Sequence, residues 1–420
     1  MKKKPTALFR WLVLVVISLA MFGNYYLYDS VAPVASLLKS QLGFTQTDIG
    51  QLNMYYSIAA IAALVFGGAF IDKYGTRISI LVFGSLCSLA GMVTMLSDNM
   101  MVMLTGRLIL GLGAEPLIVG ITVAVAKWFK GKEIAFAMGV NLMIARSGSL
   151  FANKAPAWFP ELFDHWQSAL RFAAVVGLFC GAAALVYFFQ EGYGKRKFAL
   201  GEGGDTDKLS FKGFFSYNGS YWLIVMLCLT FYSAIFPFYS TFSFLFFEEF
   251  KGLSTAAAGG LLAFLPISSM FATPLIGLLV DFKGRRASLM ALGSVLLMPV
   301  FLLIAYTSVN LIIPVAMLGV AFSLIPAIMW PSVAFVVKEK KLGKAYAFMT
   351  LLQQAGVAGM NWFLGWLNES NAASANNPLG YIPMVWALSA LGILALVFSL
   401  WLRKIETGPR SHGLEKSTIK

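Results

Sequence analysis

Long apolar runs separated by short polar segments make up most of the chain. A transmembrane helix needs about 20 predominantly apolar residues, and most of these runs reach that length. The pattern therefore predicts an all-α membrane protein with twelve transmembrane helices. We place these helices at residues 11–37, 47–71, 78–97, 100–127, 132–155, 169–190, 220–247, 255–280, 287–307, 309–336, 343–367 and 379–402.

One phrase occurs twice, half a chain apart. Residues 68–77 and 277–286 both have the pattern G-x-x-x-D-x-x-G-x-R, and each phrase joins two apolar runs. A repeat of this length among hydrophobic segments is typical of transporters built from two parallel halves; a chance match of two Asp/Arg-rich turns is the alternative. The phrase resembles the loop signature of the major facilitator superfamily, which joins the second and third helices of each half.

The repeat also predicts where the chain divides. A polar segment rich in Gly, Lys and Asp lies between the two halves and is typical of a linker. The polar C-terminal tail is expected to be disordered. We expect an N-terminal six-helix half at residues 1–190, a cytoplasmic linker at 191–219, a C-terminal six-helix half at 220–403 and a cytoplasmic tail at 404–420.

Composition and charge agree with a membrane protein. Charged residues make up 12% of the chain, compared with about 25% in soluble domains. The net charge of +13 raises the question of a nucleic-acid partner. On the twelve-helix arrangement, however, most of the 32 Lys and Arg residues lie on the side of the two termini. This is the positive-inside pattern, so we predict cytoplasmic termini and no nucleic-acid partner.

Signs of an enzyme are missing from the sequence. Cys87, Cys180 and Cys228 lie singly in apolar runs, and the two histidines, His165 and His412, are far apart in the chain. Neither set has the spacing of metal ligands. The chain also lacks a phosphate-binding Gly-Lys-Ser/Thr loop. We therefore predict that the protein is not an enzyme and carries no metal and no cofactor.

Two groups of opposite charge are expected near the middle of the membrane. Glu115 lies about 12 residues from Lys127, and Arg146 about 14 residues from Lys132, which corresponds to about 18 and 21 Å of helical rise. Ionisable groups at this depth are costly and often functional. We interpret them as a bipolar site, in which Arg146 binds a carboxylate and Glu115 binds an ammonium group. A structural ion pair is the alternative.

Six further charged residues are candidates for coupling or gating. Arg107 lies in the pattern Gly106-Arg-x-x-x-Gly111-x-Gly113, whose small residues allow close helix packing. This pattern resembles the superfamily's fourth-helix motif, whose arginine is often tied to proton coupling; a purely structural arginine is the alternative. Asp29 is a candidate gate, proton site or partner of Arg107, and an interfacial residue is the alternative. In the repeated loops, the candidates for gating are Asp72, Arg77, Asp281 and Arg286.

Neutral side chains complete the candidate substrate site. Polar side chains within transmembrane helices often hold helices together, so a structural role is the alternative for each of them. The Trp330-Pro331 step is expected to break the tenth helix and to form one wall of a cavity. Besides Glu115 and Arg146, the substrate-binding candidates are Tyr25, Tyr56, Trp330, Gln353 and Asn361.

Longer phrases resemble the family of major facilitator superfamily domain-containing protein 1, the lysosomal dipeptide carriers, and its bacterial relatives. The clearest of these phrases lie at residues 106–115, 128–133 and 145–149. The resemblance implies that Glu115 and Arg146 hold the two ends of a dipeptide. The chain departs from the family at Pro116 and at residues 57–59, and it has no acidic dileucine signal before the first helix. The missing signal and the short loops favour a bacterial inner membrane.

These observations lead to one functional prediction with several alternatives. We expect an alternating-access secondary transporter of small zwitterions, most of all dipeptides, that works as a monomer in a lipid bilayer, with protons as a candidate coupling ion. The first alternative is a proton-coupled organic-anion symporter, with Arg146 as the anion clamp. A drug exporter fits Arg146 poorly. A receptor or structural subunit that does not transport is the alternative from a different class.

Overall fold

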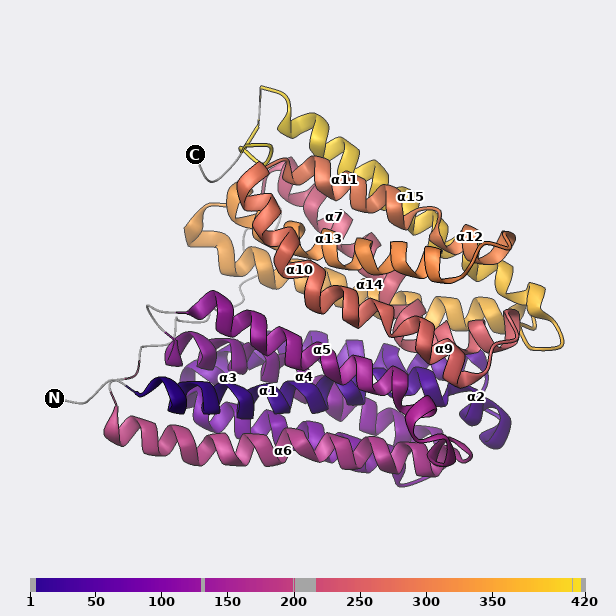
Figure 1. Ribbon diagram of the computed structural model, residues 1–420, viewed down its shortest axis with the longest axis horizontal. Helices are drawn as coiled ribbons and strands as arrows, with labels where there is room; N and C mark the ends of the chain where they lie inside the picture. Colours follow the sequence, from indigo (N-terminus) through magenta and orange to yellow (C-terminus); the bar gives the residue numbers. More distant parts are fainter. Residues whose placement is uncertain (1–4, 130–132, 199, 201–216, 410, 417–420) are drawn as a thin grey trace. The chain divides into compact units, whose positions relative to one another are not determined.

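The computed structural model describes residues 5–129, 133–198, 200, 217–409 and 411–416, and helices make up nearly all of this part of the chain (Figure 1). The chain divides into two compact units. The first unit comprises Met1–Phe44 and Gln51–Lys208, and the second comprises Thr45–Gly50 and Leu209–Lys420. The two units are described separately below.

Six α-helices build the first unit. They are α1 (Ala7–Asp29), α2 (Val31–Leu42), α3 (Gln46–Met95), α4 (Met100–Trp128), α5 (Ile134–Trp158) and α6 (Trp166–Lys197), and the short 3-10 helix η1 (Pro160–Phe163) precedes α6. The first five residues of α3 belong to the second unit. Side chains cap three of the N-termini: Thr6 accepts a hydrogen bond from the Phe9 N–H, Thr45 accepts one from the Asp48 N–H, and Asn99 accepts one from the Met101 N–H. Caps of this kind satisfy N–H groups that have no partner within the helix.

Helix α3 contains the break that the repeated phrase predicts. It is 50 residues long, and its only non-helical backbone lies at Gly75 (φ 74°, ψ 168°). Glycine adopts a positive φ without the steric penalty of a side chain. Gly75 therefore divides α3 into two segments, which correspond to the predicted helices at 47–71 and 78–97.

The second unit repeats this plan with more interruptions. Its helices are α7 (Gly219–Pro237), η3 (Phe238–Phe242), α8 (Ser243–Leu245), η4 (Phe246–Phe250), α9 (Thr255–Leu262), α10 (Phe264–Lys283), α11 (Arg286–Leu297), α12 (Val300–Tyr306), α13 (Ile312–Val336), η5 (Glu339–Lys341), α14 (Leu342–Ser370), η6 (Pro378–Tyr381) and α15 (Ile382–Glu406). The segments η3 and η4 are π-helical turns. They continue α7 into a single long span, Gly219–Phe250, most of which is buried.

Corresponding helices of the two units have corresponding neighbours. In the first unit α1 packs along α5 and α6, and in the second α7 packs along α14 and α15 (Figure 1). Helix α13 also packs against α10 and α11. The repeat that is visible in the loop phrases therefore extends to the packing inside each unit.

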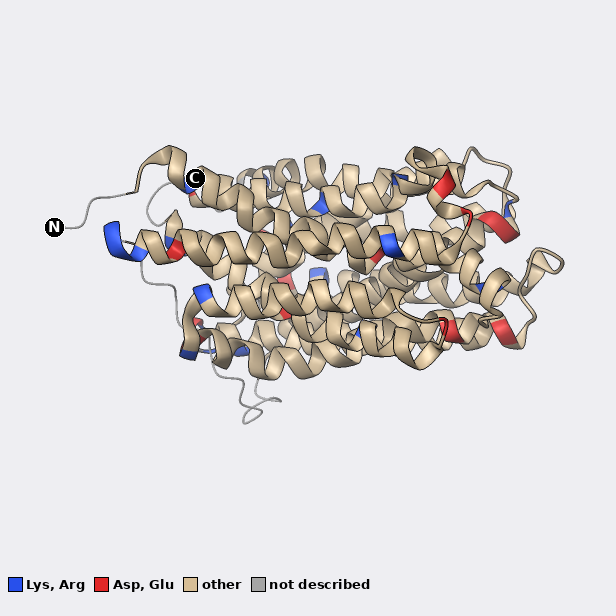
Figure 2. Cartoon of the chain, turned by 90° about the horizontal axis from the view of Figure 1, so that it is seen from below, with Lys and Arg blue, Asp and Glu red and all other residues tan. Residues whose placement is uncertain are grey.

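The helices are long and apolar enough for a protein that crosses the membrane many times. Among the described residues, nine helices meet the length and hydropathy expected of a membrane span, and α3 is long enough for two. Helices α5 and α14 are equally long but less apolar, and they complete the twelve predicted spans. In Figure 2 the Lys, Arg, Asp and Glu residues lie mainly near helix ends, with few along the helix middles. This distribution suits an apolar membrane interior.

Three sequence expectations need correction. Helix α6 continues to Lys197, past its predicted end at residue 190, and the predicted linker residues 201–216 lie outside the described residues. Helix α13 runs through Trp330 and Pro331 without a break, since a proline inside a membrane helix is tolerated where the freed backbone group finds another partner. The tail is not simply disordered, since residues 411–416 make specific hydrogen bonds with the second unit.

Candidate functional site

Glu115 and Tyr56 meet between α4 and α3 of the first unit. The Tyr56 hydroxyl donates a hydrogen bond to Glu115 Oε1 at 3.2 Å. Tyr56 is buried, while Glu115 is half-buried. A phenol that donates to a carboxylate stabilises its ionised form. The arrangement therefore holds the Glu115 carboxyl group in a fixed orientation and leaves it partly accessible.

Arg146 reaches the same neighbourhood from α5. Its guanidinium carbon lies 5.2 Å from the centre of the Tyr25 ring, on α1, at a distance typical of a cation–π contact. Tyr25 also interacts electrostatically with Arg146, Glu115 and Asp29. Tyr25 thus lies near one basic and two acidic residues, and Arg146 and Glu115 come from different helices. The structure brings together four of the predicted substrate-binding residues: Tyr25, Tyr56, Glu115 and Arg146.

Two glycines set the close helix packing at this place. A Cβ atom on Gly111 would overlap the carbonyl oxygen of Tyr56, and one on Gly148 would overlap the carbonyl oxygen of Phe22. Gly111 lies one helical turn before Glu115, so both residues are on the same face of α4. Because no side chain separates α4 from α3 there, the Tyr56 hydroxyl can reach Glu115. The contact at Gly148 brings α5 equally close to α1.

Arg107 is buried among backbone carbonyl groups. Its guanidinium donates to Leu27 O at 2.9 Å, to Tyr28 O at 3.2 Å and to Leu52 O at 3.4 Å, and it also donates to the side-chain oxygen of Asn53. Only 2% of Arg107 is exposed. These bonds connect α4 to the end of α1 and to α3. They are the contacts expected of the structural alternative, and they also place a fixed positive charge beside the site.

Arg107 contacts two aromatic rings near Glu115 and also interacts with the candidate acid Asp29. Its guanidinium carbon is 5.7 Å from the ring centres of Tyr28 and Tyr56, and these two rings are 4.6 Å apart. It also interacts electrostatically with Asp29, which is 4% exposed. The rings of Tyr28 and Tyr56 therefore lie next to the Arg107 guanidinium, and Tyr56 also contacts Glu115.

The neutral candidates of the second unit lie on α13 and α14. The indole N–H of Trp330 donates to the Tyr232 hydroxyl at 3.0 Å, and the Tyr346 hydroxyl donates to the Trp330 carbonyl at 3.1 Å. Gln353 Oε1 accepts from the Cys228 thiol at 3.8 Å. These contacts connect α13 and α14 to α7.

Asn361 is fully buried. Its amide oxygen accepts from the Thr241 hydroxyl at 2.7 Å, and its amide nitrogen donates to Val357 O at 2.9 Å. Thr241 belongs to the π-helical segment η3. The contacts of Asn361 are those of a residue that holds two helices together.

The arginines of the two repeated phrases occupy similar surroundings. Arg77 donates to Phe188 O at 2.9 Å, and its guanidinium carbon lies 3.8 Å from the centre of the Phe188 ring. The guanidinium carbon of Arg286 lies 4.4 Å from the centre of the Phe335 ring. Each arginine is thus held over a phenylalanine of its own unit.

The surroundings of the two aspartates in the repeated phrases give little information about a gating role. Asp72 is exposed on α3, three residues before the break at Gly75. Asp281 lies near the end of α10, and its side chain is outside the described part of the structure. A gating role for the four loop residues remains a prediction.

Sequence reasoning missed two members of the site, Tyr28 and Asn53. Tyr28 adjoins Asp29 in the sequence and could have been found as an aromatic residue beside a candidate acid. Asn53 carried a weaker signal, because it is one of several polar residues at the start of the second predicted helix. The carbonyl groups around Arg107 have no sequence signal at all.

Comparison with known proteins identifies the family. The model of the major facilitator superfamily matches residues 17–360. The chain belongs to the major facilitator superfamily. Within it, the chain is 32% identical over 368 residues to the lysosomal dipeptide transporter MFSD1 of Danio rerio, covering 84% of this chain and 79% of the relative. It is 30% identical over 429 residues to MFSD1 of Bos taurus, covering 97% and 88%.

Membership of the superfamily, and of the family of these relatives, confirms several predictions. The chain is a multi-pass membrane transporter rather than an enzyme, with twelve transmembrane helices in two six-helix halves. The fold also resembles the crystal structure of a bacterial homologue of the human lysosomal transporter Spinster, in an inward-facing and unoccupied conformation. That likeness has a TM-score of 0.73 at 14% identity and covers 95% of this chain and 98% of the other.

Proposed function

We propose that this superfamily member transports small zwitterions, and dipeptides in particular, by alternating access. The observation that carries the proposal is the position of Tyr25, which interacts with the positive Arg146 and the negative Glu115 from two different helices. Two opposite charges around one aromatic ring suit a ligand with an ammonium group at one end and a carboxylate at the other. The names of the relatives, lysosomal dipeptide transporters, support the same substrate class.

In this proposal each residue of the cluster has a distinct role. Arg146 holds the carboxylate, because a guanidinium offers two parallel N–H donors. Glu115 holds the ammonium group, and Tyr56 keeps the carboxylate of Glu115 ionised and oriented. The ring of Tyr25 lies beside the body of the ligand. Trp330 and Gln353 remain candidates for neutral substrate contacts, and the contacts of Asn361 favour a structural role.

Zwitterion binding also accounts better than a structural ion pair for two opposite charges on α4 and α5. A buried ion pair gains little stability, because its desolvation offsets much of its attraction. A zwitterion that enters between two such charges neutralises both and takes over their hydrogen bonds. The favourable electrostatic energy is then used for ligand binding rather than for holding α4 against α5.

For coupling and gating we propose a role for the charges next to this site. Arg107 lies beside the rings of Tyr28 and Tyr56 and interacts electrostatically with Asp29. Because the Tyr56 hydroxyl donates to Glu115, a change in the charge of Glu115 acts on Arg107 through Tyr56. The four loop residues, Asp72, Arg77, Asp281 and Arg286, act as conformational latches rather than as substrate contacts. Protons are the proposed coupling ion.

We further propose that the protein works as a monomer in a bacterial inner membrane with both termini in the cytoplasm. The excess of Lys and Arg on the side of the termini supports this orientation. The short loops support a bacterial membrane over a lysosomal one.

Uptake by proteoliposomes tests the proposed function. Purified protein is reconstituted, and uptake of a labelled dipeptide is compared with uptake of a labelled monocarboxylate, each with and without a pH gradient. We expect saturable dipeptide uptake that is lost in the Arg146→Ala variant. Uptake of the monocarboxylate without uptake of the dipeptide would instead identify an organic-anion symporter. Binding of the dipeptide without any flux would identify a receptor.

A further inference from the structure

The C-terminal tail returns to the second unit and caps helix α11. The N–H of Arg285 donates to Glu415 O at 3.3 Å, and the N–H of Arg286 donates to Leu414 O at 2.9 Å. The Glu415 carboxylate accepts hydrogen bonds from the Ser288 N–H at 2.9 Å and from the Ser288 hydroxyl at 2.8 Å. The N–H groups of a first helical turn have no partner within the helix. Residues from the far end of the chain therefore provide the N-cap of α11.

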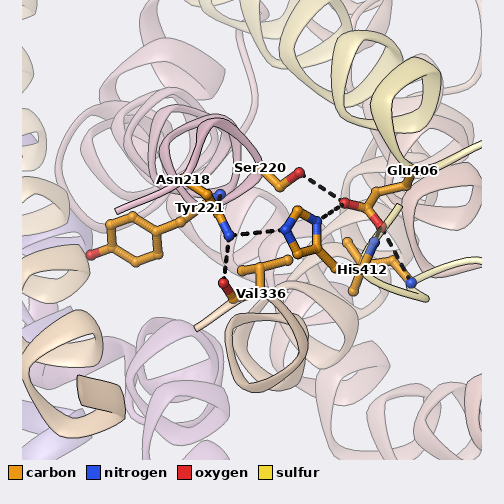
Figure 3. Close-up of polar contacts among 7 residues, drawn as sticks. Asn218, Ser220, Tyr221, Val336, Glu406 and His412 are labelled. Carbon is orange, nitrogen blue, oxygen red and sulfur yellow. Dashed lines mark hydrogen bonds and ion pairs between the residues drawn. The ribbon is translucent and has the colours of Figure 1, made fainter. Parts of the chain in front are cut away.

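The same tail is bound to the end of α15 (Figure 3). The side chain of Glu406 is fully buried. Its Oε1 atom accepts from the Ser220 hydroxyl and from His412 Nδ1, both at 2.8 Å, and its Oε2 atom accepts from the His412 backbone N–H at 2.7 Å. Ser220 lies in the first turn of α7. One buried carboxylate thus joins the tail, α15 and α7.

The other nitrogen of the His412 ring faces Asn218, the N-cap of α7 (Figure 3). Asn218 Nδ2 lies 3.1 Å from His412 Nε2 and donates to Val336 O at 2.6 Å, while Asn218 Oδ1 accepts from the Tyr221 N–H at 2.8 Å. These two bonds fix the orientation of the amide. With the amide nitrogen of Asn218 as donor, His412 Nε2 accepts from Asn218 and His412 Nδ1 donates to Glu406. Val336, the last residue of α13, joins a fourth helix to the network.

The corresponding acid in the first unit needs no tail. Glu191, near the end of α6, is also fully buried and accepts from the Thr76 hydroxyl at 2.8 Å. Its cationic partners are Lys127, from α4, and Lys195, from α6 itself at 3.3 Å. In the second unit the tail, through His412, takes the place of these helix-borne lysines. The two units therefore anchor their last helix by different means.

We propose that residues 411–416 are a clasp that holds the ends of α7, α11, α13 and α15 together as one cooperative unit. The clasp has two contact regions: Glu415 on the first turn of α11, and His412 on the ends of α7, α13 and α15. Between them Leu414 is fully buried. The free energy gained from burying one leucine and from forming these hydrogen bonds must offset the conformational entropy lost when the whole segment is ordered. Weakening either region therefore releases both.

Hydrogen–deuterium exchange tests the clasp without any assumption about the substrate. The full-length protein is compared with the variants Glu415→Ala and His412→Ala, and amide exchange is followed in peptides that cover the first turns of α11 and α7. The matched control is Lys416→Ala, because the Lys416 side chain is exposed and the hydrogen bonds of this residue within the clasp come from its backbone.

The clasp predicts a reciprocal result. Glu415→Ala raises exchange about fivefold at the first turn of α11, as expected for loss of an N-cap, and it also raises exchange at the start of α7, which Glu415 does not bind. His412→Ala raises exchange at the start of α11 in the same way. Changes confined to the helix that each residue contacts would overturn the clasp and leave two independent caps. Unchanged exchange in both variants would overturn the docking of the tail itself.

Discussion

Replacing Tyr56 with Phe tests whether Tyr56 acts through Glu115. The hydroxyl of Tyr56 lies 3.2 Å from Glu115 Oε1, while its ring lies 4.6 Å from the Tyr28 ring and 5.7 Å from the Arg107 guanidinium carbon. Phenylalanine keeps the ring and its contacts and removes only the donor to the carboxylate. The substitution therefore removes one hydrogen bond from the proposed ammonium site and leaves the rest of the site unchanged.

The expected loss of dipeptide affinity follows from the free energy of that hydrogen bond. A hydrogen bond to a charged group contributes about 1.5–3 kcal/mol, and because Glu115 is half-buried we take the lower end of this range. At about 1.4 kcal/mol for each factor of ten, Tyr56→Phe should weaken dipeptide binding about tenfold. Exchange of an exposed tyrosine, Tyr193→Phe, is the matched control and should leave affinity unchanged.

A double-mutant cycle in a binding titration provides the decisive comparison. In the Glu115→Gln background the hydroxyl of Tyr56 has no carboxylate to stabilise, so Tyr56→Phe should then change dipeptide affinity by less than about twofold. If Tyr56→Phe weakens binding by the same factor in both backgrounds, the hydroxyl acts independently of Glu115 and the assigned role of Tyr56 is wrong.

Three further predictions concern other parts of the molecule. Arg146→Lys should weaken dipeptide binding by about tenfold or more although the charge is kept, because an ammonium group cannot form the bidentate contact; wild-type affinity in a titration would remove Arg146 from the site. Asp72→Asn should lower the maximal uptake rate and leave affinity nearly unchanged, with Asp98→Asn, an exposed aspartate in another loop, as the control; lost affinity at a normal rate would argue against a gating role. Gly111→Ala should destabilise the protein by about 1–3 kcal/mol through overpacking against Tyr56, whereas Gly139→Ala, with open space around it, should not; equal thermal stability of the two variants would contradict the close packing of α3 and α4.

Much of the fold could be predicted from the sequence, because membrane helices are encoded by length and hydropathy. The repeated phrase indicated two halves, and Gly75 breaks α3 where the phrase predicts a turn. The charges of Glu115 and Arg146 also pointed to one place, since two ionisable residues at a similar depth on consecutive helices are rare in an apolar chain. The structure places both of them around Tyr25.

Other features depend on tertiary contacts that leave little trace in the sequence. The partners of Arg107 are mostly backbone carbonyl groups, which every residue carries. The docking of the tail was missed because residues 411–416 are short and largely polar, a composition typical of disorder. Its hydrogen bonds to α7 and α11 join segments more than 100 residues apart. Reasoning from local composition has no access to contacts of that kind.

The central claim is that Glu115 and Arg146 hold the two ends of a zwitterion, and one measurement tests it most directly. Binding of a free dipeptide and of its N-acetylated form is measured by thermal-shift titration on the wild-type protein and on Glu115→Gln. The account predicts that the Gln variant loses most of its affinity for the free dipeptide and little of its weak affinity for the acetylated form, because only the free amine needs the carboxylate. If both ligands bind the Gln variant as they bind the wild type, and only the response to a pH gradient disappears, Glu115 is a proton carrier and the zwitterion site is contradicted.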